Sequence, residues 1–519
     1  MAFSESWSYS KLALLGFLYS IALLACSFSV KANIQKELNV KRSDFAKDFV
    51  FGVSTSAVQT EGSSKSGGKG PNVWDAFLDK NPGAIIDGSN METAIDSYRR
   101  FKEDVKHVKD LGVDSYRFSI SWTRILPNGS LSGGVNKEGI DHYNSLIDEL
   151  IKYGIKPFVT MLHFDFPQIL EEKYGGPLSP RFVDDFKDYA EILFRTFGDR
   201  VKTWVTINEP MITVKYGYDL GFPPSGRCSD RKTCKAGNSS TEPYTVAHNF
   251  LLAHATAASL YKRKFQPKQG GQIGVSVSAQ YYEPYSKSRQ DRAAAKRGLD
   301  FEIGWFLKPL VSGHYPKIMR MIAKDRLPKF TAKEKKLVKG SIDFMGLNYY
   351  TAIYAKSIPV DFHASPVSST ADVFVNLTAE RNGVLIGPPI RGSETTYYLY
   401  PKGVQKILQY MKREFKNPAI YITENGLSQT RNDSLPFEVQ LNDPSRIDYI
   451  VQHLHRIRKA IKNGVNVKGY FYWSLLDGFE WIAGYINRFG LYYIDYNNNL
   501  TRTPKDSAKW FKRFLKHHE

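Results

Sequence analysis

The sequence predicts a single α/β domain, a (β/α)8 TIM barrel with extended loops at the C-terminal face of the strands. Eight short apolar segments recur along the chain, and amphipathic stretches of helical periodicity separate them. After residue 45 there is no Pro/Ser-rich linker, low-complexity tract or internal repeat that would divide the chain. Barrels with insertions exceed about 400 residues as one domain, so a length of 519 residues is compatible with one barrel.

The apolar segments give the expected barrel strands. They cover residues 49–56, 115–122, 156–164, 203–209, 272–280, 342–350, 418–425 and 467–476. In barrels of this type the chemistry takes place at the C-terminal ends of the strands. Polar side chains gather at those ends in this sequence, so the functional site is expected there.

Two of the intervening helices have clear limits. One ends at Gly154 and places five apolar residues on one face: Ile140, Tyr143, Ile147, Leu150 and Ile151. Another begins with Asp443 as its cap and Pro444 at its first position, and it stops near Gly464. Both helices therefore pack one apolar stripe against the barrel.

The first 32 residues resemble a secretory signal peptide. Lys11 precedes an apolar stretch over residues 12–25, and small residues follow near Ala32. The apolar stretch is too short for a stable membrane-spanning helix, and the residues on either side of it do not favour one. The sequence therefore predicts entry into the secretory pathway, with the apoplast, the vacuole or the endoplasmic reticulum lumen as the destination.

Two cysteines remain after this segment. Cys228 and Cys234 lie six positions apart in a polar loop, and the oxidising compartment favours a disulfide between them over two free thiols. A zinc site is not predicted because no histidine or further cysteine cluster lies near the pair. Five sequons are compatible with glycosylation, at Asn128, Asn238, Asn376, Asn432 and Asn499.

The chain carries a formal net charge of +19. Its basic residues are scattered among acidic ones, as in Lys333-Glu-Lys-Lys-Leu-Val-Lys339, without the aromatic-interleaved basic runs of a nucleic-acid module. The charge is therefore interpreted as a solvated surface, and no nucleic-acid partner is predicted.

Two carboxylates end near-apolar strands. Glu209 closes the segment that begins at Thr203, and Glu424 closes the one that begins at Ala419. A buried charge costs free energy unless it is paired or used. Either residue alone could be a structural ion-pair partner, but together they suit glycoside hydrolysis, which needs one protonated and one ionised carboxyl group.

Neighbouring residues could tune this pair. Arg117, early in its own strand, can keep Glu424 ionised by Coulombic pairing, or it can serve only as a structural ion-pair residue. Asn208, beside Glu209, can donate its amide to a sugar hydroxyl. The pair and its neighbours thus indicate a sugar-binding catalytic site.

Over about residues 40–515 the chain resembles the family 1 glycoside hydrolases, with plant-type features. Six motifs in the expected chain order carry the resemblance: Phe51-Gly-Val-Ser-Thr-Ser-Ala-Val-Gln-Thr-Glu-Gly62, Leu162-His-Phe-Asp165, Thr206-Ile-Asn-Glu-Pro210, Gly346-Leu-Asn-Tyr-Tyr350, Ile422-Thr-Glu-Asn-Gly426 and Trp473-Ser-Leu-Leu-Asp-Gly-Phe-Glu-Trp481. The resemblance implies that Glu209 is the acid/base and that Glu424 is the nucleophile. It also implies a catalytic barrel over residues 40–515.

The resemblance assigns further roles to matching positions. The residues expected to bind the glycone are Gln59, His163, Asn208, Glu480 and Trp481. Trp473 would form the platform between sugar and aglycone, Tyr350 would hydrogen-bond Glu424, and Phe489 would line the rim. A lone histidine is more often a core residue than a ligand, but the motif around His163 favours the ligand role.

Three positions depart from the family pattern. Val58 replaces an aromatic residue, and Phe164 and Met211 each replace a tryptophan. These changes are expected to reshape walls near the sugar and the aglycone. Substrate preference therefore does not transfer from a well-known relative.

The function predicted is that of a retaining β-glucosidase, an O-glycosyl hydrolase of plant secondary-metabolite glycosides that acts through a covalent glucosyl-enzyme and serves in plant defence. The alternatives are a transglucosidase that uses the same carboxylates, and a thioglucosidase of the Glu type in which Lys215 contacts a sulfate. A catalytically inactive sugar-binding protein is disfavoured because both carboxylates are present. No metal and no organic cofactor are predicted. The expected partner is a small-molecule β-glucoside, and a homo-oligomer is compatible with the sequence.

Overall fold

A computed structural model of the chain describes residue 38 and residues 40–391 and 396–516. The expected signal peptide, residues 1–32, lies outside the described residues. Within the described part, no helix combines the length and the apolar composition needed to cross a bilayer.

Eight parallel strands close into a barrel in the order β1-β16-β14-β7-β5-β4-β3-β2. Their bounds are β1 (Val50–Ser54), β2 (Ser115–Ser119), β3 (Lys156–Leu162), β4 (Thr203–Asn208), β5 (Gln272–Ser278), β7 (Phe344–Asn348), β14 (Ile420–Glu424) and β16 (Val467–Trp473). Each strand falls within one of the segments expected from the sequence, and the predicted (β/α)8 barrel is confirmed. The strand ends that carry the polar residues consequently meet at one face of the barrel.

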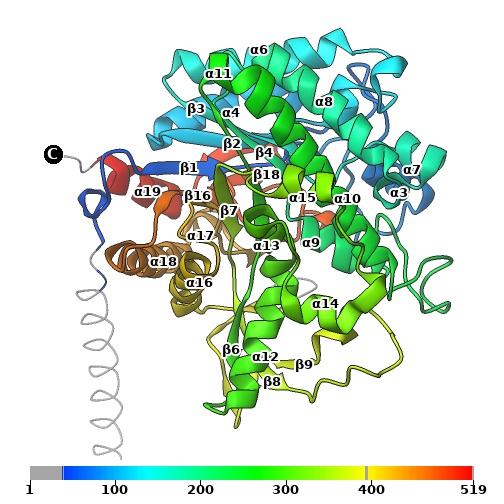
Figure 1. The fold of residues 1–519 in the computed structure, drawn as a ribbon. Helices are drawn as coiled ribbons and strands as arrows, with labels where there is room; N and C mark the ends of the chain where they lie inside the picture. The colour runs from blue at the N-terminus through cyan, green and yellow to red at the C-terminus, as the bar shows by residue number, and fades with distance from the viewer. Residues whose placement is uncertain (1–37, 39, 392–395, 517–519) are drawn as a thin grey trace, which may run out of the picture.

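Helices surround the strands on the outside (Figure 1). The longer ones are α4 (Ser97–Leu111), α6 (Lys137–Lys152), α8 (Arg181–Phe197), α10 (Glu242–Leu260), α12 (Arg289–Leu299), α16 (Pro401–Glu414), α18 (Pro444–Lys462) and α19 (Asp506–Lys516). The C-terminal helix α19 lies beside β1, so the two ends of the barrel sequence are neighbours in space (Figure 1).

The two helices analysed from the sequence form with small differences. In α6, Ile151 is 44% exposed rather than buried, because it lies about 80° round the helix from Tyr143 at roughly 100° per residue and so sits at the edge of the apolar stripe. In α18, Pro444 is the first residue as predicted, but the Asp443 side chain caps no backbone group. Its carboxylate instead accepts hydrogen bonds from Arg446 Nε at 2.7 Å and from the Ser507 hydroxyl at 2.6 Å, which joins α18 to α19.

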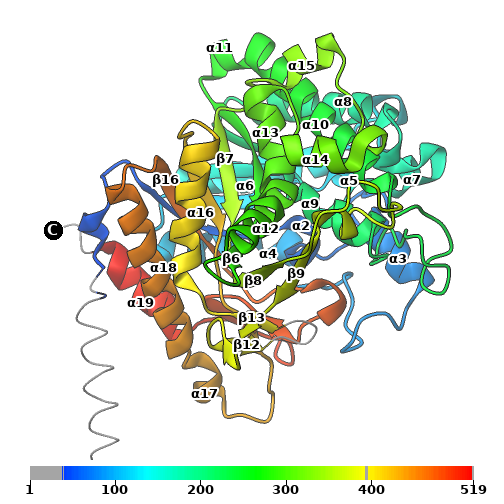
Figure 2. The same cartoon turned by 60° about the horizontal axis from the view of Figure 1, so that its bottom comes forward.

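Long connections at the C-terminal face build an additional three-stranded sheet. It consists of β6 (Tyr281–Pro284), β8 (Ala352–Ser357) and β9 (Val375–Thr378) in the order β6-β8-β9. These strands lie together beyond the end of the barrel (Figures 1 and 2). They follow the barrel strands β5 and β7 in the chain, so they form a wall beside the ends of those strands.

Candidate active site

One cavity at the C-terminal face collects most of the residues singled out from the sequence. Its lining includes Gln59, His163, Glu209, Tyr350, Glu424, Trp473, Glu480, Trp481 and Phe489. The two remaining members, Arg117 and Asn208, are buried directly behind it, at 0% and 1% exposure. The structure therefore brings all eleven together.

Glu424 is the last residue of β14 and is held by two side chains from other strand ends. Arg117 Nη1 donates to its Oε1 at 2.8 Å, and the Tyr350 hydroxyl donates to its Oε2 at 2.8 Å. Both contacts are those predicted from the sequence. Burial raises the pKa of Glu424, whereas the charge of Arg117 and the hydroxyl of Tyr350 act in the opposite direction.

Glu209 follows β4 and has no cation in hydrogen-bonding contact within the part of the chain that the structure describes. Burial raises its pKa to about 8, and the nearby charge of Glu424 adds to the rise. The amide of Asn348 donates to Glu209 Oε1 at 2.8 Å and lowers this pKa in part. At neutral pH Glu209 therefore carries a proton while Glu424 sits against a guanidinium, and the two carboxyl groups are set for different tasks.

Asn348 is a site residue that the sequence analysis missed. Its Nδ2 donates to Glu209 Oε1 and to Asn208 Oδ1, the latter at 3.1 Å, while its Oδ1 accepts from the Thr423 hydroxyl at 2.6 Å. The contact with Thr423 fixes which end of the amide faces Glu209. The sequence did contain a signal for this residue: Asn348 is the last residue of β7, just as Asn208 is the last residue of β4.

The sugar-binding side of the cavity is aromatic and carries unused polar atoms. The His163 ring is parallel to the ring of Trp473 to within 15°, with 5.7 Å between centroids. Gln59 Nε2 and His163 Nδ1 are buried and have no hydrogen-bond partner within the described residues. Burying a polar atom without a hydrogen bond costs free energy unless a ligand supplies the missing partner. These two atoms therefore suit a ligand with several hydroxyl groups.

Glu480 lies in the same cavity, and its charge is also suppressed. Burial raises the pKa of Glu480 to about 8, and the charges of Glu424 and Asp477 add to this rise. Burial likewise lowers the pKa of His163 well below its usual value, and the charge of Arg117 reinforces this. Both side chains are thus largely neutral at pH 7 and can exchange hydrogen bonds with hydroxyl groups.

The backbone around the cavity is locally strained. Glu209, Phe164 and Trp481 have φ angles of +44°, +70° and +54°, in the left-handed region that costs non-glycine residues roughly 1–3 kcal/mol each. All three line the cavity. Of the three departures from the family pattern, Phe164 is therefore a cavity wall, whereas Val58 is 7% exposed and packs in the hydrophobic core, so it forms no wall of the site.

A second cavity adjoins the first on the far side of Glu209. The two share Glu209, Tyr350 and Tyr397. Its other lining residues include Met211, the third departure from the family pattern, and residues of β9 and of the segment before it. A bound molecule that reaches past Glu209 would enter this space.

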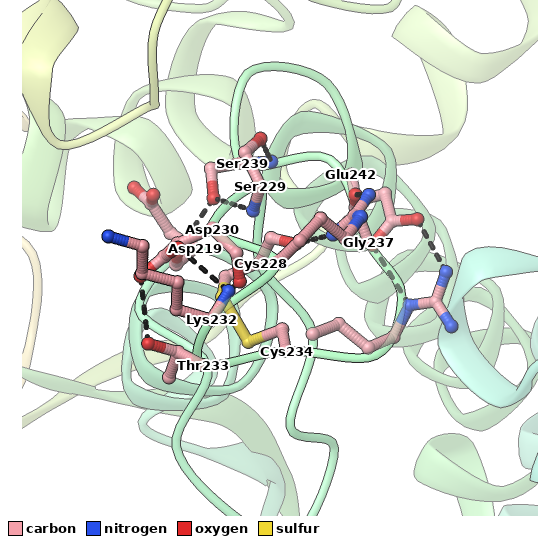
Figure 3. The surroundings of a disulfide bond; sticks show 12 residues. Asp219, Cys228, Ser229, Asp230, Lys232, Thr233, Cys234, Gly237, Ser239 and Glu242 are labelled. Atoms are coloured by element: carbon pink, nitrogen blue, oxygen red, sulfur yellow. Dashed lines mark hydrogen bonds and ion pairs between the residues drawn. A yellow bond between two sulfur atoms is a disulfide. The ribbon is translucent and has the colours of Figure 1, made fainter.

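The predicted disulfide between Cys228 and Cys234 is present, and Figure 3 shows the side chains around it. Ser239 Oγ accepts from Ser229 N at 2.9 Å and donates to Asp219 O at 2.7 Å. The Asp219 carboxylate accepts from Thr370 N at 2.7 Å, and Thr370 lines the cavity. The disulfide loop is thereby tied to a cavity wall.

All five sequon asparagines are exposed.

Comparisons with known proteins agree with the resemblance found in the sequence motifs. The model of the family described as "Glycosyl hydrolase family 1" matches residues 41–519. The chain is 50% identical to β-glucosidase 12 of Oryza sativa subsp. indica, over 96% of this chain and 98% of the relative. It is 52% identical to furostanol glycoside 26-O-β-glucosidase of Hellenia speciosa, over 92% and 84%. Among solved structures, a mutant of rice Os3BGlu6 β-glucosidase in a covalent complex with Glc superposes with a TM-score of 0.89 at 45% identity, covering 92% of this chain and 100% of that one.

Proposed function

Because this chain belongs to glycosyl hydrolase family 1 and is a β-glucosidase, we propose that it cleaves terminal β-D-glucosyl residues from plant secondary-metabolite glycosides with retention of configuration. The observation that carries the proposal is the contrast between two carboxyl groups in one cavity, of which Glu209 is partly buried and Glu424 is buried. Burial raises the pKa of Glu209 to about 8, whereas Glu424 is hydrogen-bonded by Arg117 and Tyr350.

The proposed reaction has two displacements. Glu209 donates its proton to the glycosidic oxygen as the Glu424 carboxylate attacks the anomeric carbon, so the bond to the aglycone breaks and a covalent glucosyl-enzyme forms. Glu209, now ionised, then takes a proton from water, which attacks the anomeric carbon and releases β-glucose and Glu424. Asn208, Glu480 and the unpaired amide of Gln59 would hold the sugar hydroxyls.

The stereochemistry of the product tests this proposal. In a wild-type digest of a β-glucoside followed by proton NMR, β-glucose should appear first and α-glucose only later by mutarotation. The covalent Glc complex of the rice relative supports this expectation. Immediate formation of α-glucose would show an inverting enzyme and contradict the proposal.

The pH dependence gives a second test. Glycosylation needs a protonated Glu209, and since its pKa is raised to about 8, kcat/KM should fall as the pH rises through about 8. Asn348→Ala removes a hydrogen bond that lowers this pKa, so the alkaline limb should move to higher pH. A limb that stays in place, or moves to lower pH, would contradict the role given to Asn348.

Two related activities remain as alternatives. A transglucosidase would transfer glucose to an added alcohol in preference to water, which product analysis with such an acceptor distinguishes. A sulfate-binding thioglucosidase would need Lys215 free to pair with an anion. Lys215 does line the second cavity, but the Glu302 carboxylate lines it too, and this disfavours a sulfate there.

We also propose that the protein follows the secretory route and is glycosylated. A disulfide between Cys228 and Cys234 is typical of oxidising compartments. The exposure of the five sequon asparagines is compatible with the addition of glycans.

A further inference from the structure

Apolar side chains line two sides of the cavity beyond Glu209. Met211 and Ile212 line it from the segment after β4, and Val373, Val375 and Leu377 line it from the segment around β9. It holds about 1160 Å³ of empty space, including its open mouth. A sugar bound at Glu209 and Glu424 would therefore direct its aglycone between two hydrocarbon walls.

Two opposite charges interrupt this apolar lining. Lys215 lies in the π-helix η4 (Thr213–Gly217), and Glu302 lies in the π-helix η6 (Asp300–Gly304). Single π-helical turns within helices are frequent at functional sites. Lys215 lies five residues after Pro210, so its Cα is displaced by roughly 7–8 Å along the helix from the start of α9 (Pro210–Ile212), next to Glu209. The charged pair is thus set apart from the reacting bond.

The pair interacts without forming a direct ion pair. The charge of Lys215 lowers the pKa of Glu302, opposing the rise caused by burial. Glu302 accepts hydrogen bonds from Gln280 N at 2.8 Å and from the Tyr282 hydroxyl, and a carboxylate has room for further donors. The ammonium of Lys215 lies 5.6 Å from the centre of its neighbour Tyr216's ring, and its three hydrogen-bond donors have no acceptor among the described residues.

The walls that face this pair are held in place. Asp219 accepts from Thr370 N at 2.7 Å. Arg326 forms a two-point contact with Asp372, at 2.6 and 3.0 Å. Arg297 donates to the carbonyl oxygen of Val373 at 2.6 Å. A pocket fixed in this way loses little conformational entropy on binding, so its shape and polarity select among ligands.

We infer that Lys215 and Glu302 select aglycones that have an elongated apolar body and a hydroxyl group remote from the glucosidic bond. The hydroxyl oxygen accepts from the Lys215 ammonium, and its proton is donated to the Glu302 carboxylate. One neutral hydroxyl satisfies both side chains, whereas an anionic group would pair with Lys215 only at the cost of facing Glu302. This inference rests on the proposed function, since it concerns the leaving group of the same reaction.

Matched substrates test the inference. Para-alkylphenyl β-glucosides of several chain lengths are compared with analogues in which a hydroxyl replaces the terminal methyl. The leaving phenol is nearly the same within each pair, so the ratio of kcat/KM values reports recognition of the hydroxyl. A hydrogen bond to a charged group is worth about 1.5–3 kcal/mol, so at the best chain length wild type should prefer the hydroxyl analogue by about tenfold or more. An analogue that ends in a carboxylate should be a poorer substrate than the hydroxyl analogue.

Variants then assign the preference to the two residues. Lys215→Met and Glu302→Gln should each bring the ratio close to one, and Glu302→Gln should also improve the relative rate of the carboxylate analogue. Lys235→Met and Glu438→Gln are the matched controls, because both residues are exposed and line neither cavity. They should keep the wild-type ratio. Because each ratio is internal to one variant, a loss of overall activity does not obscure it.

Three results would overturn the inference while leaving the proposed function intact. The first is a wild-type ratio near one at every chain length, and the second is a preference that survives in Lys215→Met. The third is a carboxylate analogue preferred over the hydroxyl analogue, since the site would then be an anion site. If wild type cleaved none of the glucosides, nor a nitrophenyl β-glucoside, the proposed function itself would fail.

Discussion

Glu424→Ala should lose essentially all turnover of every β-glucoside, because no side chain is left to form the glucosyl-enzyme. Replacing the nucleophile of a covalent mechanism lowers kcat by roughly four orders of magnitude or more. Added azide or formate fits the space of the missing carboxylate and attacks the same face of the sugar. With azide and an activated leaving group, cleavage should return and yield α-glucosyl azide, which NMR identifies.

The control for this variant is Glu438→Ala, which removes an exposed carboxylate outside both cavities and should keep wild-type rates. Circular dichroism checks that Glu424→Ala is folded, since Arg117 loses its ion-pair partner there and leaving a buried charge unpaired costs about 3–5 kcal/mol. Turnover near the wild-type rate, or a β-configured azide product, would show that Glu424 is not the nucleophile.

The barrel was predictable because its signals are local and repeated. Each strand is a short apolar segment with a polar residue near its C-terminal end, as in Glu209 after β4 and Glu424 at the end of β14. Parallel closure then brings those ends together whatever the intervening loops do. The contacts of Glu424 with Arg117 and Tyr350 followed from the same reasoning, joined to the family resemblance.

What was missed depends on side-chain contacts between distant segments. Asn348 acts on Glu209 only because Thr423, from the neighbouring strand, holds its amide in one orientation. Lys215 and Glu302 are 87 positions apart by their residue numbers, and nothing local shows that two π-helices face one cavity. Asp443 was expected to cap α18, but the buried Arg446 and Ser507 use its carboxylate instead. Tertiary contacts of this kind override local preference.

Glu209→Gln should separate the two half-reactions that Glu424→Ala abolishes together. A glutamine cannot donate a proton, so kcat/KM for glucosides with poor leaving groups should fall by about 10²–10⁴-fold, the usual worth of general acid catalysis. With a dinitrophenyl glucoside, protonation is hardly needed, so the glucosyl-enzyme should form in a burst and then stall, because no base activates water. Azide needs no base and should release the intermediate as β-glucosyl azide, the opposite anomer to that from Glu424→Ala. Burst kinetics and NMR of the azide product measure both effects.

If the two variants gave the same anomer, or if leaving-group activation left the Glu209 variant as slow as before, the roles given to Glu209 and Glu424 would be wrong. The physical basis of the expected difference is the site itself. Glu209 is partly buried, has no cation in hydrogen-bonding contact among the described residues, and has its pKa raised to about 8, whereas Glu424 lies 2.8 Å from the Arg117 guanidinium.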